Sequence, residues 1–250
     1  MSTEATPDVS SKPATASTDS PAPPPATAAK PPKSARGRPT DDPDTRWSKT
    51  LSYILRHGAA KESLKLREDG FVRVEDLLKR PKLKGCDHET LERIVRENAK
   101  QRFTMRPEST GEGGKAELWI RANQGHTVKV EALELKPVEK ADQVPTMVHG
   151  TYHRLWPQIE KEGLKVMTRN HIHCAIGLFG EDGVTSGMRA NCDLFIYLDV
   201  PALLSDGVPI FTSSNQVVLT SGIDGTIPPK YFARVVRKSG ETLVPTTMTP

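Results

Sequence analysis

Residues 102–123 read RFTMRPESTGEGGKAELWIRAN, and this stretch decides how the first half of the chain is interpreted. RFTMR and ELWIRAN contain the β-branched and aromatic residues typical of strands, and the glycine-rich STGEGGK between them predicts the turn of a hairpin. Helical patterns precede it: a first amphipathic helix, a short one in VEDLLKR, and a longer one that Asp87 caps. Helices followed by a β-hairpin predict a winged-helix-like lobe, which we place over residues 46–135.

The first helix is predicted over about residues 47–57, where apolar side chains recur at helical spacing. It ends on Arg56, His57 and Gly58. Such an ending predicts a C-terminal cap, with the glycine in the left-handed conformation and the basic side chains at the negative end of the helix dipole.

The second half has short apolar segments and few helices. A charged stretch, ELKPVEKADQVP, predicts a linker before it. Strands are predicted in MVHGTY, IHCAI, DLFIYLDV, VPIFTS, QVVLT and YFARVVR, and helices in YHRLWPQIEKEG and PALLSD. The fold class is therefore α+β, with a mixed, largely antiparallel sheet in a second lobe over 145–238.

The segment 1–45 differs from the rest in composition. It holds 10 of the 21 prolines and one Val, with no Leu, Ile or aromatic residue. It cannot bury enough apolar surface to offset the entropy of ordering, so we expect a disordered tail. It resembles neither a secretory signal nor a transit peptide, and nowhere does the chain approach the ~20 apolar residues of a membrane span. Three widely spaced cysteines fit a reducing compartment, so we expect an intracellular protein, cytoplasmic and/or nuclear.

The formal charge of +4 is unevenly distributed. Residues 46–130 hold 19 Lys and Arg against 12 Asp and Glu, whereas residues 131–250 hold 11 against 13. An excess of positive charge in one half favours a polyanionic partner. No GxGxxG follows a strand, and no GxxxxGK[ST], HExxH or GxSxG motif is present. His171 and His173 lack a third ligand nearby in the sequence, so no metal site is expected.

Arginine and histidine recur at the ends of predicted segments. Arg56-His57 ends a helix, Arg121 ends the strand ELWIR, Arg189 lies in the turn TSGMRANC, and His149 ends another strand. Guanidinium groups bind phosphate oxygens bidentately, so these side chains would form a cationic cradle for phosphate if they met. Sequence spacing alone does not show that they meet.

Six motifs, in order, resemble those of the RNA 2'-phosphotransferases (tRNA 2'-phosphotransferases) over about residues 46–238: LRHG, RANQGH, HGT, RNHIHCA, SGMR and NQVVLTSGIDGTIPPKYF. The resemblance implies a winged-helix-like first lobe, a second lobe related to ADP-ribosyltransferases that binds NAD, and an active site between them. It implies as substrate an RNA with an internal 2'-phosphate, as left by tRNA ligation. The implied products are 2'-hydroxyl RNA, nicotinamide and ADP-ribose 1'',2''-cyclic phosphate.

The resemblance also implies roles for individual residues. The family's catalytic Arg-His, Arg and Arg fall on Arg56, His57, Arg121 and Arg189. Gln124 and His126 fall on the RNA or phosphate side, and Thr127 stands where a serine is expected. The NAD side is implied for His149, Gly150, Thr151, His173 and Ser186, with Val217 or Val218 as the aliphatic position of QVVL.

The implied chemistry suits these residue types. In the first step the RNA 2'-phosphate attacks the anomeric carbon of the nicotinamide ribose, and nicotinamide leaves as a neutral molecule without needing an acid. In the second step the ribose 2''-hydroxyl attacks the phosphodiester and expels the RNA 2'-oxygen. Arginines stabilise the phosphoryl charge and a histidine supplies the proton to the leaving oxygen, so no metal is required.

Two alternatives stay open. One is an ADP-ribosyltransferase that stops after the first step and caps terminal nucleic-acid phosphates. The other is a winged-helix protein that binds RNA or DNA without catalysis.

Overall fold

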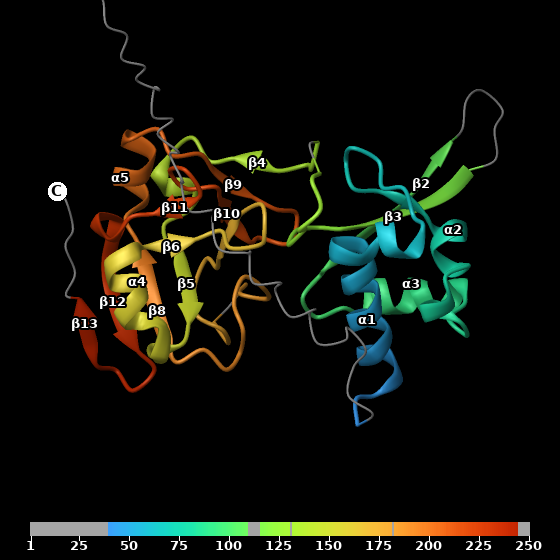
Figure 1. The fold of residues 1–250 in the computed structure, drawn as a ribbon, viewed down its shortest axis with the longest axis horizontal. Helices are drawn as coiled ribbons and strands as arrows, with labels where there is room; N and C mark the ends of the chain where they lie inside the picture. Colours follow the sequence, from blue (N-terminus) through green and yellow to red (C-terminus); the bar gives the residue numbers. More distant parts are fainter. Residues whose placement is uncertain (1–39, 110–115, 131, 182, 245–250) are drawn as a thin grey trace, which may run out of the picture. The chain divides into compact units, whose positions relative to one another are not determined.

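The computed structural model describes residues 40–109, 116–130, 132–181 and 183–244 (Figure 1). The predicted disordered tail lies outside these residues up to position 39. Its predicted end at residue 45 is wrong, because helix α1 (Pro43–Tyr53) begins at Pro43. Asp42 caps this helix by accepting a hydrogen bond from the Thr45 amide at 2.9 Å, and proline is favoured in the first turn, where its missing N–H has no partner to lose.

The first half combines three α-helices with a small sheet in the described residues (Figure 1). The sheet order is β1-β3-β2, antiparallel throughout. The predicted pairing of the hairpin strands is confirmed, with Phe103 opposite Ala122 and Ser109 opposite Ala116, and its predicted turn at residues 110–115 lies outside the described residues. After α1 the elements are η1 (Ile54–Gly58), η2 (Ala60–Glu62), β1 (Val72–Arg73), α2 (Val74–Leu78), η3 (Pro81–Leu83), α3 (His88–Arg96), β2 (Phe103–Ser109) and β3 (Ala116–Ala122).

Asp87 caps helix α3 as predicted, accepting a hydrogen bond from the Thr90 amide at 2.8 Å. The helix ends at Arg96 and not at about residue 100.

The ending of the first helix differs from the prediction. Ile54–Gly58 forms one π-helical turn, and Gly58 does not adopt the left-handed conformation; that conformation occurs at Ser63, with φ 55°. A Cβ at Gly58 would lie 2.6 Å from Tyr53 Cε1. The glycine is thus required by close packing of the Tyr53 ring and not by a cap.

The second half contains a four-stranded sheet β4-β9-β10-β7, a second one β13-β12-β8-β5, and the pair β11-β6, with every named pairing antiparallel. A bridge between Val148 and Ala175 connects the two larger sheets. The elements are β4 (Lys136–Pro137), η4 (Ala141–Gln143), β5 (Val148–Thr151), η5 (His153–Leu155), α4 (Trp156–Glu162), β6 (Leu164–Lys165), β7 (Ile172–Cys174), β8 (Leu194–Leu198), α5 (Val200–Ser205), β9 (Ile210–Thr212), β10 (Val218–Thr220), β11 (Thr226–Ile227), η6 (Pro229–Tyr231), β12 (Phe232–Arg237) and β13 (Thr242–Val244).

The predicted linker ELKPVEKADQVP is part of this second half. Lys136 and Pro137 pair with β9, and the neighbouring Val138 and Val144 are buried in its core. The described strands also extend beyond residue 238, because β13 adds an edge to β12. An α+β fold with antiparallel sheets is thus observed, and the likenesses to a winged helix and to ADP-ribosyltransferases stay predictions.

Buried apolar side chains form one large cluster in each half, the first centred on Leu51, Leu77 and Ile120 and the second on Ile196 and Val218. Hydrogen bonds join the halves across the loops that follow α3 and β3. The Lys100 carbonyl accepts from Asn215 Nδ2 at 3.0 Å, and the Val128 carbonyl accepts from Asn170 Nδ2 at 3.0 Å. These contacts bring the ends of β3 and β7 together around a cavity.

Candidate functional site

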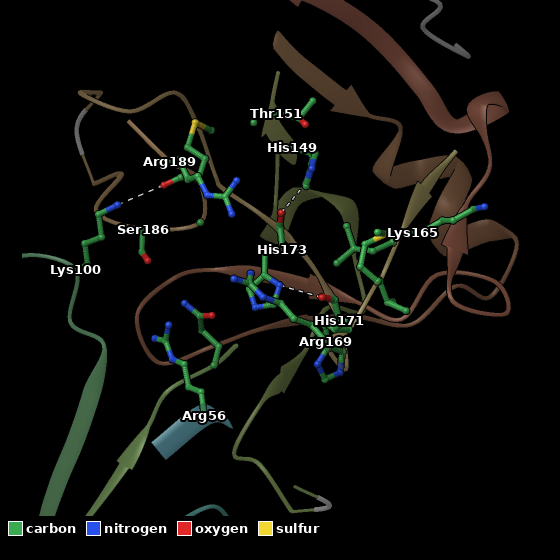
Figure 2. A pocket seen from close by; sticks show the side chains of 18 of the residues that line it. Arg56, Lys100, His149, Thr151, Lys165, Arg169, His171, His173, Ser186 and Arg189 are labelled. Atoms are coloured by element: carbon green, nitrogen blue, oxygen red, sulfur yellow. Dashed lines mark hydrogen bonds between the residues drawn. The ribbon is translucent and has the colours of Figure 1, made fainter. Parts of the chain in front are cut away.

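A cavity of about 590 Å³ lies between residues of both halves. Arg56 of the π-turn, Gln124 after β3, and Lys100 and Arg102 before β2 line it from the first half. The second half contributes β5, the end of β6, β7, the β6–β7 loop and the loop before β8, and Figure 2 shows their side chains converging. The lining residues from these five segments include His149, Gly150, Thr151, Lys165, Met167, Arg169, His171, His173, Ser186 and Arg189.

The cavity carries positive charge without compensation. Six of its described lining residues are Lys or Arg and none is Asp or Glu. Only Lys165 forms an ion pair among the described residues, with Glu162 at 2.8 Å. The other five cations, which have no carboxylate partner among the residues that the structure describes, are Arg56, Lys100, Arg102, Arg169 and Arg189.

The cations perturb one another because they are partly removed from water. Desolvation, followed by the charges of Arg102 and Arg169, lowers the pKa of Arg56 to about 10. Desolvation likewise lowers the pKa values of Lys100, Arg102 and Arg169. The Arg56 Nε and Nη2 atoms are buried and have no hydrogen-bond partner in the described part of the chain. Buried donors without acceptors beside unpaired cations make a site that an anion would stabilise.

Two neutral imidazoles add hydrogen-bond acceptors. His149 Nδ1 lies 2.9 Å from the His173 carbonyl, and His173 Nδ1 lies 2.9 Å from the His171 carbonyl (Figure 2). Since a carbonyl only accepts, both Nδ1 atoms carry the proton and each Nε2 offers a lone pair. Desolvation and the Arg169 charge lower the pKa of His173 to about 3, and its buried Nε2 has no partner. Cations with imidazole acceptors suit a ligand that carries both phosphate and hydroxyl groups.

The predicted phosphate-binding residues are only partly brought together. Arg56 and Arg189 line the cavity. His57 does not: its Nδ1 lies 3.0 Å from Thr127 Oγ1, and desolvation, then Arg56 and Arg169, lower its pKa. Arg121 does not line the cavity either: it is buried, donates to Glu134 at 2.7 Å, and stacks on Phe71 with 4.7 Å between guanidinium carbon and ring centroid.

Of the two residues predicted on the RNA side, one lines the cavity and the other does not. Gln124 lines the cavity, whereas His126 is 2% exposed and both its ring nitrogens lack partners. Desolvation, together with the charges of Arg56, His57 and Arg121, lowers the pKa of His126 to about 4. His126 thus lies close to the predicted catalytic residues without lining the cavity itself.

The residues predicted on the NAD side line the cavity together: His149, Gly150, Thr151, His173 and Ser186. A Cβ at Gly150 would lie 2.9 Å from Met188 Cβ, which explains why a glycine follows His149. The aliphatic positions Val217 and Val218 are fully buried and do not line the cavity.

Sequence reasoning missed several lining cations. Arg169 could have been predicted from the sequence, because it is the first residue of the RNHIHCA motif. Lys100 and Arg102 fall outside every motif, and contacts of Lys100 with Asn215 and Met188, distant in sequence, bring that segment to the cavity.

Two further searches of the described residues gave negative results. None of their helices is long and apolar enough to cross a bilayer. They also contain no group of three or more His, Cys, Asp and Glu arranged to hold a metal ion.

Comparison with known proteins adds family information. Residues 42–222 match the model of the family described as RNA 2'-phosphotransferase, Tpt1/KptA. The tRNA 2'-phosphotransferase 1 of Homo sapiens is 45% identical over 198 residues, covering 78% of this chain and 77% of its own length. The tRNA 2'-phosphotransferase of Saccharomyces cerevisiae is 36% identical over 206 residues, covering 79% and 86%.

A Schizosaccharomyces pombe relative is 45% identical over 204 residues, or 82% of this chain, which spans only 54% of that relative's length. The matched region contains every residue that lines the cavity. With more than half of its length matched by the family model, the chain belongs to the RNA 2'-phosphotransferase, Tpt1/KptA family.

Proposed function

We propose that this protein is an NAD-dependent tRNA 2'-phosphotransferase that moves the internal 2'-phosphate of spliced RNA to NAD. The observation that carries the proposal is the cavity lined by six Lys and Arg side chains with no Asp or Glu among its described residues. Both reactants are anions that bear ribose hydroxyls, and the cavity offers unpaired guanidinium donors beside neutral imidazole acceptors. Family membership and the tRNA 2'-phosphotransferase names of the relatives support the same reaction.

In this proposal Arg56 and Arg189 hold the RNA 2'-phosphate. Their guanidinium groups reach the cavity from opposite halves of the chain and have no competing carboxylate among the described residues. Holding the phosphate in line with the anomeric carbon converts a bimolecular attack into an effectively unimolecular one. A bound phosphate would then supply an acceptor for the buried Arg56 Nε and Nη2 atoms, which have no hydrogen-bond partner among the described residues.

The fit for NAD, a co-substrate here, rests on different atoms. Nε2 of His173 is a buried acceptor without a partner, as a ribose hydroxyl would require. Thr151 and Ser186 add hydroxyl groups, and Gly150 lets the backbone beside them pack against Met188. When bound, NAD supplies the electrophilic anomeric carbon and the 2''-hydroxyl of the second step.

The second step needs a proton for the RNA 2'-oxygen as it leaves. His57 is next to Arg56, and desolvation with nearby cations keeps the pKa of the imidazole below its ordinary value. A bound phosphate would offset those cations and raise that pKa toward neutrality, so that the imidazole becomes a proton donor when substrate is present. The products are 2'-hydroxyl RNA, nicotinamide and ADP-ribose 1'',2''-cyclic phosphate, formed through an ADP-ribosylated 2'-phosphate.

Arg121 has a less direct part in this proposal. Its guanidinium is paired with Glu134, so from its described position it acts on the cavity through its charge, as it does on His126. Contact with the phosphate would require the guanidinium to leave Glu134.

The test is incubation with NAD of an RNA that carries one internal 2'-phosphate, with identification of the products. We expect loss of the 2'-phosphate and formation of cyclic ADP-ribose phosphate, reduced on the order of 10²–10³-fold in Arg189→Gln, by analogy with the loss of one charge-stabilising donor. Arg96→Gln is the matched control, because its 69% exposed side chain lies outside the cavity.

Two outcomes would favour the alternatives. Accumulation of ADP-ribosylated RNA without the cyclic product indicates a transferase that stops after the first step. RNA binding without NAD consumption, unaffected by Arg56→Lys and Arg121→Lys, indicates a binding protein.

A further inference from the structure

Phe179 is an exposed aromatic side chain beside the cavity. It is 50% exposed, and no other aromatic occurs among the exposed large apolar side chains of the described residues. The turn Leu178–Glu181 presents it: the Glu181 amide donates to the Leu178 carbonyl at 3.1 Å, and Glu181 Oε2 accepts from the Leu178 amide at 2.7 Å. Gly180, at φ 102°, allows this turn. The ring is therefore held outward by a hydrogen-bonded turn.

Lys100 connects this ring with the cavity. Its ammonium lies 5.4 Å from the Phe179 ring centroid, and the residue itself lines the cavity. The Lys100 ammonium donates to the Met188 carbonyl at 3.4 Å, the dashed line in Figure 2, and its own carbonyl accepts from Asn215. Lys100 is thus hydrogen-bonded at both its backbone and its ammonium, and it places a cation next to the Phe179 ring at the edge of the cavity.

We propose that Phe179 is a stacking platform for a nucleobase that flanks the 2'-phosphorylated nucleotide of the RNA, with Lys100 beside it to contact the RNA backbone. This inference rests on the proposed function for the class of ligand. A phosphate held by Arg56 and Arg189 belongs to a polymer, which must leave the cavity on both sides. Phe179 does not line the cavity, so a ligand enclosed there would not reach it, whereas a flanking nucleotide would.

The combination of an aromatic face and a cation is typical of single-stranded nucleic-acid binding. Stacking requires the flat face of the ring and not merely apolar volume. Phe179→Leu, which keeps apolar volume without an aromatic face, therefore separates stacking from simple packing against Lys100, and Phe179→Trp enlarges the face.

The experiment measures binding of the full chain, without NAD, to fluorescent single-stranded RNA oligonucleotides at one fixed salt concentration. One oligonucleotide carries an internal 2'-phosphate, and two others carry in addition an abasic site directly 5' or directly 3' of it. We expect Phe179→Ala and Phe179→Leu to weaken binding roughly 5- to 150-fold and Phe179→Trp to retain it. Ile223→Ala, which shortens a 40% exposed side chain outside the cavity, is the matched control and should bind as the unsubstituted chain does.

The abasic oligonucleotides test the partner of the ring. One of them should bind the unsubstituted chain as weakly as the intact RNA binds Phe179→Ala. Combining Phe179→Ala with that abasic oligonucleotide should lower the affinity no more than either change alone, because the ring and the base form one contact. The proposal is overturned if Phe179→Leu binds the intact RNA with normal affinity and has an unchanged melting temperature. It is equally overturned if each abasic site lowers the RNA affinity of Phe179→Ala as much as it lowers that of the unsubstituted chain. It is also overturned if Phe179→Ala loses affinity for NAD and not for RNA. Failure to release phosphate in the presence of NAD, with this binding pattern intact, would instead contradict the proposed function.

Discussion

Replacing Arg56 by methionine should make the protein more stable while it removes the phosphate site. Desolvation and neighbouring cations lower the pKa of Arg56 from 12.5 to about 10, which corresponds to about 3 kcal/mol against the charged form in the folded state. At pH 7.5 the guanidinium is charged in both the folded and the unfolded chain, so this whole cost is present. Methionine has a similar length and no charge, and replacing an uncompensated buried charge with an apolar side chain commonly gains about 1–4 kcal/mol.

We expect the free energy of unfolding of Arg56→Met to rise by about 1–3 kcal/mol, since the site relaxes in part around the missing guanidinium. The measurement is urea denaturation, followed by tryptophan fluorescence, in a buffer free of phosphate and sulfate. Added inorganic phosphate should stabilise the unsubstituted chain, by about 1.4 kcal/mol at ten times its dissociation constant, and should stabilise Arg56→Met less.

Arg121→Met is the matched control, for which we expect the free energy of unfolding to change in the opposite direction. Arg121 is also buried, but Glu134 pairs with it at 2.7 Å and the Phe71 ring stacks on it. Its replacement should lower the free energy of unfolding by about 1–3 kcal/mol. The reasoning is refuted if Arg56→Met is destabilised by 1 kcal/mol or more in the phosphate-free buffer, because the guanidinium would then have a stabilising partner in the folded chain.

The remaining predictions concern pH, packing and salt. Burial holds the pKa of His126 at about 4 and that of His173 at about 3. As the pH falls below about 6.5, both histidines are protonated in the unfolded chain before they are protonated in the folded one. The free energy of unfolding therefore decreases, by up to about 1.4 kcal/mol per pH unit for each histidine. This stability is fully present above pH 6.5 and is lost toward pH 4; His126→Asn should remove its share of the slope in denaturation curves, and an unchanged slope would contradict the argument. Gly58→Ala should lower both the melting temperature and phosphate transfer, since its Cβ meets Tyr53 Cε1 at 2.6 Å, and adding Tyr53→Leu should restore part of both; no restoration would contradict the packing argument. Arg169→Gln should reduce the slope of log affinity for RNA against log salt concentration by about 1, with Arg96→Gln unchanged; equal slopes in both variants would exclude a phosphate contact of Arg169.

Local chemistry made much of the first half predictable. The Asp87 cap and the β2–β3 hairpin depend on residues close together in sequence, and both are observed. The π-turn at Ile54–Gly58 was missed because a glycine after a basic pair also suits a cap. The position of the Tyr53 ring distinguishes the π-turn from a cap, and that position depends on side-chain packing, which the local sequence does not record.

The site could be predicted where its residues lie in motifs. The resemblance grouped His149, Thr151 and His173, and the structure places them in one cavity. It could not supply Lys100 or Arg102, because their position depends on contacts between distant segments. Nor did it indicate that Glu134 pairs with Arg121, since a motif records residue types and not their partners.

The two-residue strand β4 has a practical consequence for dividing the chain. A fragment that starts at residue 145, where the second lobe was predicted to begin, would lack Lys136 and Pro137 and the buried Val138 and Val144. It would leave β9 as an uncovered edge, which invites pairing between molecules and aggregation. An expression fragment intended to bind nucleotide on its own should therefore begin before Lys136.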